Sequence, residues 1–133
     1  MSKKVCLDCG HGGSDPGAVK GSRTEKEDVL RLGLKVRDLL TAAGINVVLT
    51  RTADESVSIN DRCKIANAAK CDYFLSIHRN AATPDAVGNE IWVHSQAVAH
   101  VVDKAQKILN AVCAVAGKNR GVKKGAAGNY TDY

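Results

Sequence analysis

Short apolar runs alternate with helix-periodic segments along this sequence, and this alternation restricts the possible folds more than any other feature. Apolar runs of about four to eight residues bounded by turn residues predict buried strands, whereas apolar residues repeated at helical spacing predict amphipathic helices. The expected elements are strands over Val5–Cys9, Ile45–Leu49, Tyr73–Ile77 and Glu90–His94, and helices from Thr24 to Gly44, from Ser58 to about Ala69 and from about Ala97 to Ala116. This order predicts an α/β fold, with a mostly parallel sheet flanked by helices on both faces.

The first expected helix has clear end signals. Thr24 is a natural N-cap, and Glu27, three residues later, completes the pattern of a capping box. Gly44 is suited to the C′ position that follows a helix. With Glu27 folded back onto the helix start, Glu25 occupies the first helical position and its carboxylate is free to reach another group.

The later segments leave the sheet without a closing strand. Ile45–Leu49 is expected to be buried, and Tyr73–Ile77 is apolar almost throughout, as in a strand covered on both faces. Glu90–His94 alternates apolar and polar residues and is expected nearer an edge. Lys118–Tyr133 is polar and glycine-rich, so no element is expected there. We therefore expect a C-terminally incomplete domain whose exposed sheet edge permits self-association.

Size and composition indicate a single globular domain covering residues 1–133. A hydrophobic share of 44% and a charged share of 25% exclude a disordered chain. No apolar run approaches the roughly 20 residues of a membrane span, and the opening residues lack the apolar region of a signal peptide. We expect synthesis in the cytoplasm without a signal peptide and no insertion into a membrane.

The net charge of +5 favours an anionic partner, such as nucleic acid, acidic lipid or a bacterial wall polymer. Surfaces that bind single-stranded nucleic acid combine basic with aromatic side chains. Aromatic residues make up only 4% of this chain, which argues against nucleic acid. A basic surface that serves solubility alone is the alternative.

Five cysteines are an odd number, scattered through expected strands and helices, which does not suit a disulfide framework. Cys6 and Cys9 form a C-x-x-C pattern, but strand residues three apart point to opposite faces. Structural thiols are therefore expected, and a cysteine redox protein is a remote alternative.

Three potential metal ligands are expected at one edge of the sheet. His11 follows the first strand and His78 the third, and right-handed crossovers make these strands parallel. Ligands of open α/β folds bind at the carboxyl ends of the strands, where Glu25 also begins its helix. Two imidazoles and a carboxylate form a three-ligand zinc set with a fourth position for water. Ordinary polar surface groups are the alternative, and His94 and His100 are best interpreted that way.

Several segments share the sequence and spacing of a known family. The first loop contains Asp8-Cys9-Gly10-His11-Gly12-Gly13-Ser14-Asp15-Pro16-Gly17-Ala18, and the third strand ends in Ser76-Ile77-His78-Arg79-Asn80-Ala81. These segments resemble the zinc-dependent N-acetylmuramoyl-L-alanine amidases. Further similar positions are Glu25-Lys26, Val47–Asp54, Arg62, Asn67, Gly88–Glu90 and Asn119–Lys123.

The resemblance implies one zinc ion held by His11, Glu25 and His78. It also implies cleavage of the amide between muramic acid and L-alanine in peptidoglycan. Asp15 and Asn80 match positions lining the family's site. Arg79 replaces a residue that is usually small, which would alter the groove or add an anionic contact.

The family's catalytic glutamate lies on a late strand, and no residue of this chain matches it. We therefore expect poor hydrolysis by the 133-residue chain, although zinc would still bind. The leading hypothesis is an endolysin-like amidase, without a separate wall-binding domain in this chain, that acts on the cell wall after release. The second is a truncated domain that binds zinc or the wall without turnover.

Overall fold

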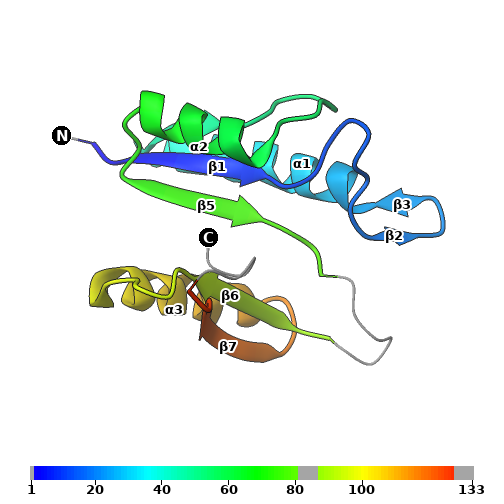
Figure 1. The fold of residues 1–133 in the computed structure, drawn as a ribbon. Coiled ribbons are helices and arrows are strands. Elements are labelled where there is room, and N and C mark those ends of the chain that lie inside the picture. Colours follow the sequence, from blue (N-terminus) through cyan, green and yellow to red (C-terminus); the bar gives the residue numbers. More distant parts are fainter. Residues whose placement is uncertain (1, 81–86, 128–133) are drawn as a thin grey trace. The chain divides into compact units, whose positions relative to one another are not determined.

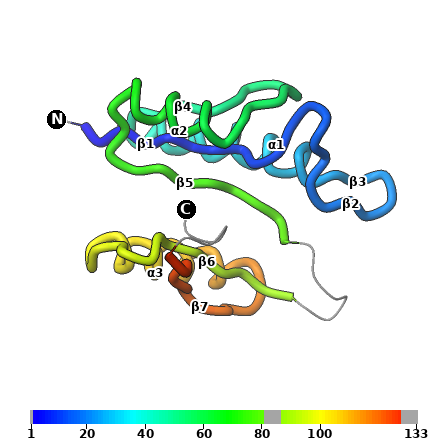
Figure 2. Tube along the Cα trace, in the orientation of Figure 1, coloured from blue at the N-terminus to red at the C-terminus, as the bar shows by residue number. Residues whose placement is uncertain are grey.

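The computed structural model describes residues 2–80 and 87–127, drawn as a ribbon in Figure 1 and as a tube in Figure 2. The chain divides into two compact units, Met1–Ala81 and Ala82–Tyr133, and each unit is described by itself. The sequence-based expectation of one domain stays a prediction.

The first unit is built around a parallel sheet with strand order β4-β1-β5. Its strands are β1 (Lys4–Cys9), β4 (Asn46–Leu49) and β5 (Tyr73–Ile77), and its helices are α1 (Glu25–Ala42) and α2 (Ile59–Ala68). A small antiparallel pair, β2 (Val19–Lys20) and β3 (Arg23–Thr24), precedes α1. This unit confirms the expected α/β class and its parallel sheet.

The two helices of this unit cover opposite faces of β1 (Figure 1). A Cβ atom added to Gly33 of α1 would meet the sulfur of Cys9, so α1 packs on the face to which Cys9 points. On α2, Arg62 bonds the carboxylate of Asp8, the preceding strand residue. Successive strand residues point to opposite faces, so the expectation of helices on both faces is confirmed here.

The second unit is a β-α-β arrangement of β6 (Asn89–Val93), α3 (Ala99–Cys113) and β7 (Asn119–Lys124), in which β6 and β7 are parallel. Its small core contains Val93, Ala105 and Leu109, all buried. No helix in the described ranges has the length and apolar character needed to cross a membrane.

The structure corrects two sequence-based expectations. The tail expected to be polar and irregular contains β7, which forms because it pairs with β6 despite its polar composition. Strands β4 and β5 are the outer strands of their sheet, so they are only half-buried, and Phe74 of β5 is 46% exposed.

The ends of α1 and α2 follow local sequence signals. At the end of α1, the Gly44 N–H donates to the Thr41 carbonyl and the Ile45 N–H to the Leu40 carbonyl, which is a Schellman motif with Gly44 at φ 79°. Thr24 is the N-cap of α1, but its hydroxyl donates to the Glu27 carboxylate instead of accepting a backbone N–H. The expected capping box is therefore not formed in the described structure, where the side chains of Thr24 and Glu27 bond to each other instead.

We predict that Gly33→Ala destabilises the protein, although alanine is normally favoured over glycine inside a helix. The added methyl group would overlap the sulfur of Cys9, which is fully buried, and overpacking of this kind costs about 1–3 kcal/mol. Urea denaturation measures the change in the free energy of unfolding.

The Cys9→Ala variant provides the matched background, because it removes the sulfur. The Gly33→Ala penalty should disappear there. A Gly33→Ala protein more stable than the unsubstituted chain would contradict the close packing of α1 on β1.

Candidate metal centre

His11, Glu25 and His78 come from three elements that meet at one end of the sheet. Cys9 of β1 lies opposite Ile77 of β5 in parallel register, so the residues that follow these strands emerge at the same edge. The Gly10 N–H donates to the Ile77 carbonyl at 3.2 Å and continues this pairing beyond the strands. Gly10 is required here, because any Cβ at this position would overlap the His78 ring.

Three ligand atoms form a nearly equilateral triangle. Glu25 Oε1 lies 3.2 Å from His11 Nε2 and 3.0 Å from His78 Nδ1, and the two nitrogens are 3.1 Å apart. Hydrogen bonding alone does not account for three mutual contacts. When His11 donates its Nδ1–H to Asp15, its Nε2 carries a lone pair, so Nε2 and Glu25 Oε1 are two acceptors that face each other. Zinc bonds of about 2.0–2.1 Å at tetrahedral angles separate neighbouring ligand atoms by about 3.3 Å. The donor set and its spacing therefore fit a zinc ion.

Glu25 is held as a buried anion. It is 3% exposed, and its two oxygens accept the Ala18 N–H at 2.9 Å and the Arg79 N–H at 2.6 Å. Burial raises the pKa of this carboxyl, but the two backbone N–H groups and the neighbouring histidines lower it more, so the pKa of Glu25 lies below its ordinary value. The carboxylate is therefore ionised at neutral pH, as a metal ligand must be.

His11 is oriented by its backbone and by Asp15. Its φ of 59° is in the left-handed region, which is uncommon for a residue other than glycine. Its Nδ1 lies 2.8 Å from Asp15 Oδ2, and Asp15 Oδ1 accepts the Gly17 N–H at 3.0 Å. A carboxylate that accepts from Nδ1–H leaves the lone pair on Nε2, which is the arrangement found around zinc-binding histidines.

Two buried arginines hold the backbone that carries His11. Arg51 donates to the carbonyls of Cys9 at 2.8 Å and Gly10 at 3.0 Å. Arg62 donates to the carbonyls of Cys9 and His11, both at 2.8 Å. Arg51 and Arg62 are 2% and 8% exposed, so three consecutive carbonyls at the end of β1 are fixed in a desolvated environment.

The buried carboxylate of Asp8 compensates positive charge of Arg51 and Arg62. It is 4% exposed, and its Oδ1 accepts from Arg62 at 2.5 Å and from the Thr50 hydroxyl at 2.7 Å. Its other oxygen accepts from the Ser76 hydroxyl at 2.6 Å. Asp8 thereby ties α2 and both outer strand ends to β1 directly beneath the centre.

No role was predicted for Arg51, Arg62 or Asp8, although all three lie at positions that resemble the family. A charged residue inside an apolar strand, as Asp8 is, was the available signal, because charged residues are rarely buried without a partner.

The other residues singled out in the sequence lie at different distances from the three ligand atoms of His11, Glu25 and His78. Asp15 contacts His11 directly. Arg79 supports Glu25 with its backbone N–H and donates from its side chain to the Ala18 carbonyl at 2.9 Å. Asn80 follows it and is exposed. His94 and His100 belong to the second unit and are exposed.

The cysteines do not support a redox centre. Cys6 and Cys9 are buried and unpaired, and burial raises the pKa of the Cys6 thiol to about 12. A thiol with such a pKa stays protonated and unreactive at neutral pH.

Comparison with known proteins gives concordant matches. The family model described as N-acetylmuramoyl-L-alanine amidase matches residues 5–130. An endolysin of Bacillus phage SPP1 is 42% identical over 112 residues, which is 83% of this chain and 41% of the endolysin. The sporulation-specific N-acetylmuramoyl-L-alanine amidase of Bacillus subtilis is 46% identical over 80 residues, covering 59% of this chain and 31% of that protein. The chain thus spans less than half the length of these curated relatives.

Solved structures are also similar to this chain. The N-acetylmuramoyl-L-alanine amidase from Clostridium difficile 630 superposes with a TM-score of 0.87 at 31% identity, covering 93% of this chain and 70% of that chain. Cwp6 from Clostridium difficile gives a TM-score of 0.91 at 35% identity, covering all of this chain and 22% of that one.

We predict that Arg51→Lys destabilises the protein by at least about 2–3 kcal/mol, because an ammonium group cannot reproduce the fork that serves several carbonyls and would leave buried acceptors unpaired. Besides Cys9 and Gly10, the Arg51 guanidinium serves the carbonyls of Lys26 and Ala53. Thermal or urea denaturation measures the loss.

Arg37→Lys is the matched control, because within residues 2–80 and 87–127 Arg37 pairs only with its neighbour Asp38 on the surface of α1. This change should stay within about 0.5 kcal/mol. Equal effects of the two substitutions would show that the buried fork has no special importance.

Proposed function

Because this chain belongs to the N-acetylmuramoyl-L-alanine amidase family, we propose that it hydrolyses the amide between N-acetylmuramic acid and L-alanine in peptidoglycan, with one zinc ion. The observation that carries this proposal is the triangle of ligand atoms from His11, Glu25 and His78, held at 3.0–3.2 Å from one another. We further propose that the protein acts on the cell wall after release from the cytoplasm, as the similarity to a phage endolysin suggests.

The chain's own residues would hold and orient the metal. His11 Nε2, Glu25 Oε1 and His78 Nδ1 are the ligand atoms, and Asp15 keeps His11 in the tautomer that presents Nε2. A bound zinc ion would polarise the scissile carbonyl and lower the pKa of a water molecule at the open position. The Ala18 and Arg79 N–H groups hold the Glu25 carboxylate in place, so little reorganisation is needed when the substrate binds.

A general base is also required, since a positioned acid or base typically contributes about 10²–10⁴-fold. Within residues 2–80, the two other carboxylates near the triangle are already engaged. Asp15 accepts from His11 and Gly17, and Asp28 is paired with arginines. This observation favours a second candidate function, in which the chain binds zinc and the wall without efficient turnover.

Zinc content should distinguish Glu25 from Glu27. Glu25→Gln removes the anionic ligand and should abolish stoichiometric zinc binding, as should His78→Ala, because two remaining ligands hold zinc poorly. Metal analysis after dialysis measures the zinc bound per chain.

Glu27→Gln is the matched control. Among the residues that the structure describes, Glu27 bonds only to the Thr24 hydroxyl in the first turn of α1, and glutamine can replace it there. The Glu27→Gln protein should bind zinc like the unsubstituted chain. Full zinc occupancy in the Glu25→Gln protein would refute the assignment of the ligands.

Turnover is tested with purified peptidoglycan, by measuring newly released N-terminal L-alanine. The proposed function predicts release that is abolished by a chelator, restored by zinc and absent in the His78→Ala protein. Bound zinc with retention on peptidoglycan, but without release, would support the second candidate. Release that is insensitive to chelation would contradict the role of the metal.

A further inference from the structure

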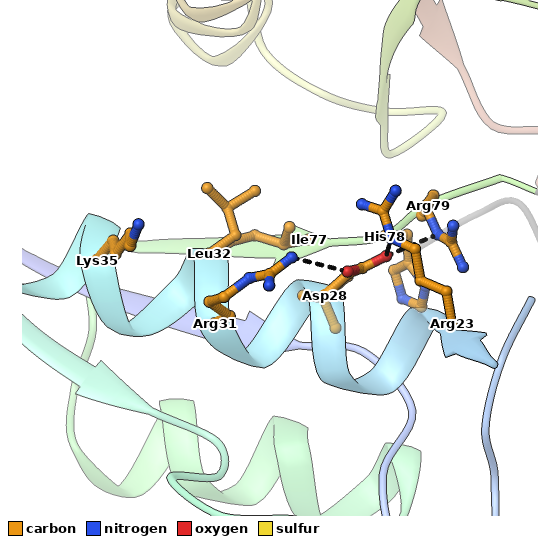
Figure 3. Close-up of a pocket in the computed structure, with 9 residues that line it drawn as sticks. Arg23, Asp28, Arg31, Leu32, Lys35, Ile77, His78 and Arg79 are labelled. Carbon is orange, nitrogen blue, oxygen red and sulfur yellow. Dashed lines mark hydrogen bonds and ion pairs between the residues drawn. The ribbon is translucent and has the colours of Figure 1, made fainter.

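A pocket of about 360 Å³ adjoins the metal centre and is lined by residues of α1, β3 and the end of β5 (Figure 3). His78 belongs both to the triangle and to the wall of this pocket. A substrate held at the metal centre can therefore extend into the pocket without leaving the protein surface.

The pocket carries more positive than negative charge. Four cationic side chains line it, together with one carboxylate, and these residues are Arg23, Arg31, Lys35, Arg79 and Asp28. Asp28 is the shared partner of the three arginines, with ion pairs of 2.7 Å to Arg23, 3.0 Å to Arg31 and 3.4 Å to Arg79 (Figure 3). One carboxylate cannot neutralise three guanidinium groups, so positive charge is left over.

One further feature leaves a cationic group available to a ligand. Lys35 makes no ion pair with any residue in the described ranges, and it lies four residues after Arg31, where two like charges on a helix repel. The Nε atom of Arg79 has only the 3.4 Å ion-pair contact with Asp28 Oδ2 and no hydrogen bond among the described residues, so this contact is the weakest of the three. An anion in the pocket would reduce the repulsion between Arg31 and Lys35.

The size and the apolar residues of the pocket suit a short peptide. Asp28 and Lys35 are seven residues apart on α1, which corresponds to about 10 Å along the helix and to about three residues of an extended chain. Leu32, between them, is 50% exposed and offers apolar contact. A peptide that leaves the metal centre past His78 would run along this face of α1.

We propose that this pocket is a subsite for a carboxylate on the peptide side of the substrate, borne by the residue that follows L-alanine. Guanidinium groups favour planar carboxylates as partners, and the three arginines already surround the carboxylate of Asp28 through one ion-pair contact each. The proposal rests on the proposed function, because it assumes that peptidoglycan occupies the metal centre. The preference of the protein among peptidoglycan stem peptides would then depend on four residues, Arg23, Arg31, Lys35 and Arg79.

The test compares two soluble probes on the zinc-loaded chain. One is N-acetylmuramoyl-L-alanyl-D-glutamate with both glutamate carboxyl groups free, and the other is the same molecule with both groups amidated. Since hydrogen bonds between charged groups are stronger than neutral ones, the free acid should bind about tenfold more tightly. Its advantage should shrink as salt is added, because the cations are partly exposed and screened. Titration calorimetry measures both affinities.

The double variant Arg31→Gln/Lys35→Gln should lose most of the preference for the free acid, because it removes two of the four cationic groups of the pocket. The matched control, Arg37→Gln/Lys64→Gln, removes the same charge from exposed residues that do not line the pocket and should keep the preference. Equal binding of both probes by the unsubstituted chain would overturn the subsite while leaving the proposed function intact.

Two other outcomes of this experiment would also overturn the proposed subsite. If neither probe binds and neither is hydrolysed, both the subsite and the proposed function fail. If a glycerol phosphate oligomer displaces the free acid and itself loses affinity in the double variant, the pocket recognises phosphate of a wall polymer and the carboxylate assignment is wrong.

Discussion

The hydrogen bonds from two buried guanidinium groups to the end of β1 determine the geometry of the candidate metal centre. Arg51 and Arg62 together fix three consecutive carbonyls, those of Cys9, Gly10 and His11. Without these donors, the carbonyls would be buried and unpaired, which costs about 1–3 kcal/mol each. The unusual backbone conformation of His11 persists because the surrounding hydrogen bonds leave it no alternative.

The positions of Glu25 and His78, the other two proposed ligands, depend on how α1 and β5 pack against β1. Gly33 lets α1 approach the sulfur of Cys9, which places Glu25, the first residue of the helix, beside the strand ends. The parallel register of β1 and β5 brings His78 to the same edge. Strand pairing, helix packing and buried charge thus act together, so three residues distant in sequence meet within hydrogen-bonding distance.

Features with local signals could be predicted from the sequence, whereas features that depend on distant partners could not. The Ser58 cap of α2 and the Gly44 stop of α1 use only neighbouring residues, and both were predicted. The proximity of His11 and His78 was predicted because the carboxyl ends of parallel strands lie at the same edge of a sheet. Strand β7 was missed because its polar residues form a strand only by pairing with β6. The arginine contacts were missed because their acceptors are backbone carbonyls, which leave no mark in the sequence.

The most direct test of this account is a crystal structure of the zinc-loaded protein with data collected at the zinc absorption edge. The account predicts one anomalous peak per chain, about 2.0–2.2 Å from His11 Nε2, Glu25 Oε1 and His78 Nδ1. A zinc peak at the cysteines, or at His94 or His100, with none between these three atoms would contradict it.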